Sequence, residues 1–109
     1  MSSSGQIDPQ LEVTVADVAA SKDSVQQLID VRELDEWQEW RIAGGTLIPM
    51  SEFAARVGEL DPAQPLIVYC KSGGRSLMVA EALQNAGYDA KSMAGGFLEW
   101  ERAGHPVER

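Results

Sequence analysis

Residues 66–76 read Leu-Ile-Val-Tyr-Cys-Lys-Ser-Gly-Gly-Arg-Ser, and residues 77–86 continue Leu-Met-Val-Ala-Glu-Ala-Leu-Gln-Asn-Ala. The run Leu66–Tyr69 is apolar without polar alternation, which is typical of a strand buried on both faces of a parallel sheet. Residues 77–86 place apolar side chains at helical spacing, and Gly87 suits the end of that helix. The loop 70–76 therefore joins a central strand to a helix, the unit from which α/β folds are built.

Short apolar runs and helix patterns continue to alternate on both sides of this unit. Further strands are predicted at 12–14, 27–31, 46–48 and 88–93, and further helices at 15–20, 33–40, 51–57 and 97–103. The expected core-facing side chains of these helices include Leu34, Trp37, Trp40, Phe53, Ala54, Val57, Phe97 and Trp100. We expect an α/β fold with a central, mainly parallel five-stranded sheet and helices on both faces.

Length and charge limit the possible classes of protein. The 109 residues suffice for one domain, and we expect a flexible N-terminal tail at 1–10 followed by a single domain at 11–109. The formal net charge of −8 argues against partners such as nucleic acid or a membrane surface, because it repels phosphate backbones and anionic lipid. The sequence shows neither a membrane-length apolar run nor a signal peptide, so we expect a cytoplasmic protein.

Cys70 is the single cysteine of the chain. It can form neither an intramolecular disulfide nor a cysteine-rich zinc site, and it follows the central strand, where parallel sheets bind ligands. Gly73 and Gly74 let the backbone curl so that N–H groups point inward, and the helix starting near Ser76 adds the positive end of its dipole. Such a cup stabilises an anion, and a thiolate is one. Cys70 therefore has the surroundings of a nucleophile.

The bland alternative is a tight strand-to-helix connection in which Cys70 ends a core strand and the two loop cations, Lys71 and Arg75, are solvated. We favour the reactive interpretation because glycines and cations in this order, between a buried strand and a well-patterned helix, are improbable by chance.

The chain resembles single-domain members of the rhodanese family from about Val13 to Val107. The loop matches the family pattern C-R-x-G-x-R-S/T, with Lys71 where arginine is usual. Residues 30–32 resemble its D-x-R, and residues 95–107 resemble its closing G-G-x-x-x-W and G-x-P-V. The stretch 41–49 departs from the family pattern at three positions, where Arg41, Ala43 and Gly45 replace the usual histidine, proline and alanine.

This resemblance implies sulfurtransferase chemistry without a metal or organic cofactor. Cys70 would attack the sulfane sulfur of a small anionic donor such as thiosulfate, hold it as a persulfide and pass it to a thiol, cyanide or protein acceptor. The implied substrate-binding residues are those of the loop: Lys71, Ser72, Gly73, Gly74, Arg75 and Ser76. Their N–H groups would stabilise the terminal sulfur and their cations would hold the donor. Ser76 would also cap the helix and donate a hydrogen bond to the sulfur. Asp30 and Arg32 could line the pocket, but we favour a buried ion pair that braces the loop.

Three other functions remain as alternatives. A phosphatase of the related cysteine-loop type needs C-x5-R spacing, whereas four residues separate Cys70 from Arg75. A sulfur-relay carrier in a thiolation or cofactor-building pathway would use the same persulfide. A non-catalytic interaction module would not need Cys70. The acidic side chains of residues 33–39 are interpreted as a solvated helix face that could also dock a basic partner.

Overall fold

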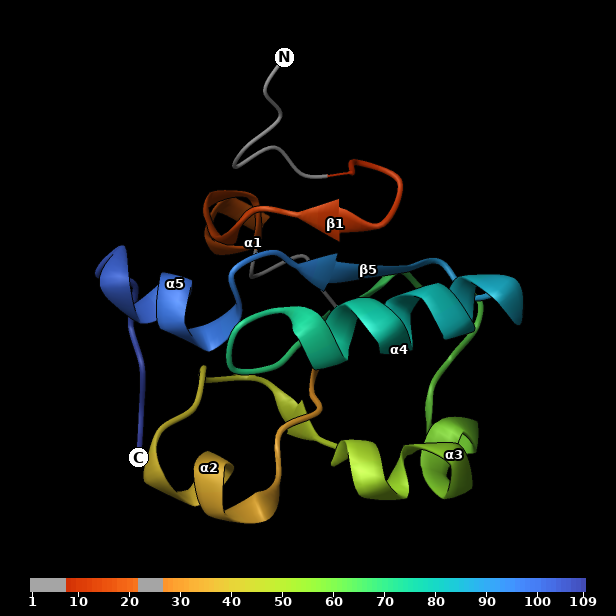
Figure 1. Ribbon diagram of the computed structural model, residues 1–109, viewed down its shortest axis with the longest axis horizontal. Helices are drawn as coiled ribbons and strands as arrows, with labels where there is room; N and C mark the ends of the chain where they lie inside the picture. The colour runs from red at the N-terminus through yellow and green to blue at the C-terminus, as the bar shows by residue number, and fades with distance from the viewer. Residues whose placement is uncertain (1–7, 22–26) are drawn as a thin grey trace.

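The computed structural model describes residues 8–21 and 27–109, so the tail expected at 1–10 lies mostly outside the described residues. Its five strands form one sheet in the order β1-β5-β4-β2-β3 (Figure 1). They are β1 (Glu12–Val13), β2 (Gln27–Asp30), β3 (Thr46–Leu47), β4 (Leu66–Tyr69) and β5 (Ala90–Met93). Every neighbouring pair is parallel. This confirms the α/β class and the central place of residues 66–69.

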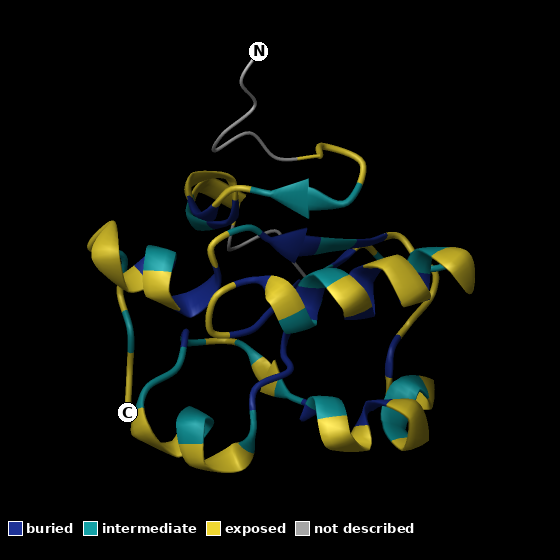
Figure 2. Cartoon of the chain, in the orientation of Figure 1, coloured by how far each residue is buried: buried dark blue, intermediate teal, exposed yellow. Residues whose placement is uncertain are grey.

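Helices cover both faces of the sheet, as expected. They are α1 (Val15–Ser21), α2 (Leu34–Glu39), α3 (Phe53–Arg56), α4 (Gly74–Asn85) and α5 (Gly96–Arg102). Alternate β4 side chains point to opposite faces: Leu66 and Val68 join a core cluster with α3 and α4, whereas Tyr69 joins one with α1 and α5. Figure 2 shows β5 largely buried and the outer sides of the helices exposed. No helix among the described residues is long and apolar enough to cross a membrane.

Three details of the sequence prediction are wrong. Helix α4 begins at Gly74, ahead of the start predicted near Ser76. Leu34, expected in the core, is 52% exposed at the first position of the six-residue α2. Ala54 is also exposed, because α3 is a single turn between two 3-10 turns, Met50–Glu52 and Val57–Glu59. A 3-10 turn has three residues per turn, so the apolar face is displaced from the predicted α-helical stripe.

The tryptophans divide between core and rim. Trp100 is buried in the core, whereas Trp37 and Trp40 on and after α2 are half-buried. Helix α2 follows β2 at the carboxyl edge of the sheet, where the residues after the parallel neighbours β2 and β4 lie side by side. At this edge the Val31 N–H donates to the Tyr69 carbonyl at 2.9 Å. The register thus brings the segments beginning at Val31 and Cys70 side by side.

Candidate active site

The Cys70 thiol lies inside the loop between β4 and α4. Its Sγ accepts hydrogen bonds from the Gly73 N–H at 3.1 Å, the Ser76 N–H at 3.4 Å and the Ser76 hydroxyl at 3.4 Å. The curl is possible because Gly73 adopts a φ of 108°, which a side chain disfavours. The sulfur therefore sits at the N-terminus of α4, surrounded by donors, and the residue is only 1% exposed.

These donors govern the ionisation of Cys70. Burial alone would raise the pKa of the thiol, but hydrogen bonds from the Ser76 hydroxyl and from the N–H groups of Ser76, Gly73 and Ser72 outweigh it and lower the pKa below its ordinary value. A lowered pKa enriches the thiolate, which is the nucleophilic form of cysteine. The loop thus stabilises negative charge on sulfur with neutral dipoles.

Ser76 donates its hydroxyl to the Cys70 sulfur as expected, but it does not cap the helix. Gly73 occupies the N-cap position, and Ser76 lies within the first turn of α4. Its hydroxyl oxygen is 2.7 Å from the hydroxyl oxygen of Ser92 on β5 and 3.3 Å from the Gly73 carbonyl. Both serines are fully buried. The hydroxyl that faces the sulfur is therefore fixed by the neighbouring strand.

The start of α5 holds the backbone of the loop. The Phe97 N–H donates to the Cys70 carbonyl at 2.8 Å, and the Leu98 N–H donates to the Lys71 carbonyl at 3.0 Å. A Cβ at Gly96 would lie 2.6 Å from both of these carbonyl oxygens, so the close approach requires glycine there. The sequence places Gly95 and Gly96 directly ahead of the helix predicted at 97–103, but it does not indicate this contact with the loop. The paired glycines ahead of the helix were the available signal.

Asp30 and Arg32 form the expected buried ion pair. The Arg32 side chain donates to both Asp30 oxygens at 2.8–3.1 Å, and the two residues are 0% and 4% exposed. The Arg32 guanidinium also donates to the Trp40 carbonyl at 2.7 Å and lies over the Phe97 ring at 4.5 Å. The pair thus fastens the end of α2 and supports α5. Its bracing of the loop, through Phe97, is indirect.

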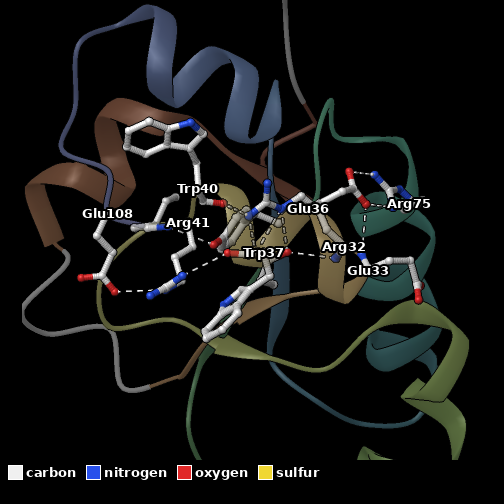
Figure 3. Close-up of polar contacts among 11 residues, drawn as sticks. Arg32, Glu33, Glu36, Trp37, Trp40, Arg41, Arg75 and Glu108 are labelled. Atoms are coloured by element: carbon white, nitrogen blue, oxygen red, sulfur yellow. Dashed lines mark hydrogen bonds and ion pairs between the residues drawn. The ribbon is translucent and has the colours of Figure 1, made fainter.

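The two loop cations have different surroundings. Lys71 is exposed. Arg75 donates to both carboxylate oxygens of Glu36 on α2, at 3.1 and 3.2 Å (Figure 3). These hydrogen bonds lower the pKa of Glu36. Glu36 is therefore not part of a freely solvated acidic face, and contact between Arg75 and an anionic donor stays a prediction.

A hollow of about 170 Å³ borders the loop. Its lining combines charged and apolar side chains from α2 and the residues flanking it, from the loop and from α5: Arg32, Glu36, Glu39, Trp40, Lys71, Phe97, Leu98 and Glu101. Within the described ranges no three histidine, cysteine or acidic side chains come together to hold a metal ion. The loop contributes Lys71 to this lining, but not Cys70 or Arg75.

Arg41 and His105 follow α2 and α5 in the chain. Arg41 donates to the Trp37 carbonyl at 3.1 Å and pairs with Glu108 at 3.3 Å, which fastens the C-terminal segment to α2 (Figure 3). His105 packs against the Trp100 ring, with 4.8 Å between centroids. Neither side chain has a contact with Cys70.

Comparison with known proteins gives one consistent family. The Rhodanese-like domain profile matches residues 14–103. The putative sulfurtransferase YtwF of Bacillus subtilis is 30% identical over 96 residues, which span 84% of this chain and 93% of that protein. The HTH-type transcriptional regulator Rv0324 of Mycobacterium tuberculosis is 37% identical over 84 residues, 74% of this chain. The chain spans just 37% of the regulator's length.

A solved structure agrees with the fold. The rhodanese-related protein from Thermoplasma volcanium superposes with a TM-score of 0.86 at 28% sequence identity. The superposition covers 90% of this chain and 97% of that one. Sequence and structure comparisons thus point to the same family over nearly all of the described domain.

Proposed function

The chain belongs to the rhodanese-like domain family of sulfur-transfer proteins, and we propose that Cys70 carries the transferred sulfur as a persulfide. One observation supports this most strongly: the Cys70 Sγ accepts three hydrogen bonds at the N-terminus of α4. That arrangement favours an anionic sulfur without needing a general base. Thiosulfate is the proposed small-molecule donor.

In the first step the Cys70 thiolate attacks the terminal sulfane sulfur of thiosulfate. A new S–S bond forms, the S–S bond of the donor breaks, and sulfite leaves with the bonding electron pair. The product is an anionic Cys70 persulfide. Charge is conserved, since a monoanion and a dianion give a monoanion and a dianion, and no proton is transferred.

In the second step a nucleophilic acceptor attacks the outer sulfur of the persulfide. The Cys70–sulfur bond breaks, and its electron pair returns to Cys70 as thiolate. With cyanide the product is thiocyanate, and a small thiol or a protein cysteine would instead become a persulfide. Because the chain has one cysteine, no second thiol of its own can resolve the persulfide. Turnover therefore depends on an external acceptor.

The loop residues have defined parts in this proposal. The N–H groups of residues 71–76 would stabilise the negative charge of the outer sulfur, as an oxyanion hole does for oxygen. Lys71 would attract the anionic donor. A cytoplasmic location belongs to the same proposal, because a reducing compartment keeps Cys70 as a thiol between turnovers.

The test is thiocyanate formation from thiosulfate and cyanide, with Cys70→Ser measured in parallel. We expect turnover with the wild-type chain and none with the variant, since a serine hydroxyl is not ionised at neutral pH and cannot store sulfur. Equal thiocyanate formation by both chains would reject the proposal. Turnover with a small-molecule persulfide such as glutathione persulfide, but not with thiosulfate, would support Cys70 as the sulfur carrier and reject thiosulfate as the donor.

A further inference from the structure

Two of the three cations around the Cys70 loop are neutralised by carboxylates. Arg32 is held by Asp30, and Arg75 is held by Glu36. Lys71, which is exposed, belongs to none of the ion pairs among residues 8–21 and 27–109. Glu39 and Glu101 line the same hollow. The surroundings of the loop are thus much less positive than the number of basic residues near it indicates.

The Glu36 carboxylate is fixed in place. Besides its two hydrogen bonds from Arg75, its Oε1 accepts the Glu33 N–H at 3.0 Å in the capping box of α2. Its side chain is 26% exposed and that of Arg75 is 35% exposed. Rotation of Glu36 away from Arg75 would therefore also break its hydrogen bond with the Glu33 N–H.

Arg75 is the second residue of α4 and directly precedes Ser76, whose N–H donates to the Cys70 Sγ at 3.4 Å. Hydrogen bonding by Glu36 raises the pKa of Arg75, and the Cys70 thiolate raises it further. An anion that approaches Cys70 therefore experiences both the Arg75 cation and the Glu36 anion. A second negative charge on that anion gains little from Arg75 while Glu36 is present.

We propose that Glu36 determines donor specificity: by neutralising Arg75 it disfavours doubly charged sulfur donors relative to singly charged ones. The inference goes beyond the proposed function. It rests on that function only in taking the anion to be a sulfur donor, because the charge effect applies to any anion that reaches Cys70. It predicts that loss of the Glu36 charge, with Arg75 retained, improves selection for the more negative of two otherwise matched reagents.

The first experiment measures this charge effect without sulfur transfer. Iodoacetate and iodoacetamide alkylate the same Cys70 thiolate and differ by one negative charge, so the ratio of their rate constants cancels any change in thiolate content. We expect Glu36→Gln to raise the iodoacetate-to-iodoacetamide ratio about threefold at low ionic strength, with the rise shrinking in salt. Glu36→Asp, which keeps the charge, should leave the ratio near the wild-type value.

Two controls identify the source of the change. Glu81→Gln removes the same charge from an exposed position on α4 outside the hollow, and it should not reproduce the rise. The double variant Glu36→Gln with Arg75→Gln should return the ratio toward wild type, because no freed guanidinium remains. An unchanged ratio in Glu36→Gln, or an equal rise in Glu81→Gln, would overturn the proposal.

The second experiment uses two sulfane donors, thiosulfate with two negative charges and methanethiosulfonate with one. The leaving groups are sulfite and methanesulfinate, and both reactions leave the same Cys70 persulfide. We expect Glu36→Gln to raise the thiosulfate-to-methanethiosulfonate ratio of kcat/KM about threefold, mainly through KM for thiosulfate. A changed alkylation ratio without persulfide formation would reject the proposed function alone. Sulfur transfer with both ratios unchanged would reject the role of Glu36 alone.

Discussion

Removal of the Ser76 hydroxyl is predicted to make Cys70 less reactive below its pKa. The Ser76 Oγ lies 3.4 Å from Sγ, and both residues are buried, so water does not replace the lost donor. A hydrogen bond to a charged group is worth about 1.5 kcal/mol at the lower end of its range, which suits a long contact to sulfur. The N–H donors of Gly73 and Ser76 remain in Ser76→Ala.

This loss corresponds to about a tenfold fall in the thiolate fraction at a pH well below the pKa, since 1.36 kcal/mol is tenfold in an ionisation constant. The assay is the rate of iodoacetamide alkylation as a function of pH. We expect the Ser76→Ala profile to shift to higher pH, with the alkaline plateau close to the wild-type rate. The plateau shows that access to the sulfur is unchanged.

Ser92→Ala is the matched control. Ser92 is equally buried, and its hydroxyl is hydrogen-bonded to that of Ser76 at 2.7 Å. The Ser92→Ala variant therefore loses a hydroxyl from the same network, but one that has no hydrogen bond to the sulfur. Ser92→Ala should lower the free energy of unfolding about as much as Ser76→Ala does. Its alkylation rates should stay within about twofold of the wild-type rates at each pH, since the Ser76 hydroxyl that donates to the sulfur is retained. An unshifted Ser76→Ala profile, or an equal shift in Ser92→Ala, would refute the assignment of the Ser76 hydroxyl.

Three further predictions concern the supports of the site. Gly96→Ala should nearly abolish sulfur transfer, because its Cβ would lie 2.6 Å from two carbonyl oxygens of the loop. Gly104→Ala, which also replaces a glycine at positive φ but in open space, should retain transfer. Equal activity of the two variants would contradict the role given to the Gly96 contact. Asp30→Asn should lower the free energy of unfolding by about 3 kcal/mol in urea titration, because it leaves Arg32 buried without a counter-charge; a loss below about 1 kcal/mol would contradict the pair's structural role. Glu36 has a pKa lowered in the folded state, so its stabilising effect is present above the ordinary value of 4.5 and is lost as pH falls through the folded pKa. The stability difference between wild type and Glu36→Gln should therefore shrink below pH 4.5, and a difference that grows on acidification would show the sign to be wrong.

Local pattern was sufficient to predict the strand at 66–69, the loop after it and the alternation of strands and helices. These features depend on neighbours in the sequence: apolar runs, glycines and helical spacing. The buried Asp30–Arg32 pair was also predicted, helped by the family resemblance, because its members are two residues apart.

The contact between Glu36 and Arg75 could not be predicted in the same way. The two residues are 39 apart in the sequence, and their meeting depends on how α2 lies across the carboxyl edge of the sheet. The seating of α5 on the carbonyls of Cys70 and Lys71 likewise depends on tertiary packing. The sequence shows a glycine at position 96, which permits another segment to come close. It does not show which part of the backbone lies against it.

The most direct test of the central claim is the intact mass of the protein after incubation with thiosulfate, before and after cyanide, with Cys70→Ser treated identically. We expect the wild-type chain to gain the mass of one sulfur atom, cyanide to remove it as thiocyanate, and the variant to gain nothing. A sulfur adduct that persists in Cys70→Ser, or one that cyanide fails to remove from the wild-type chain, would contradict a transferable persulfide on Cys70.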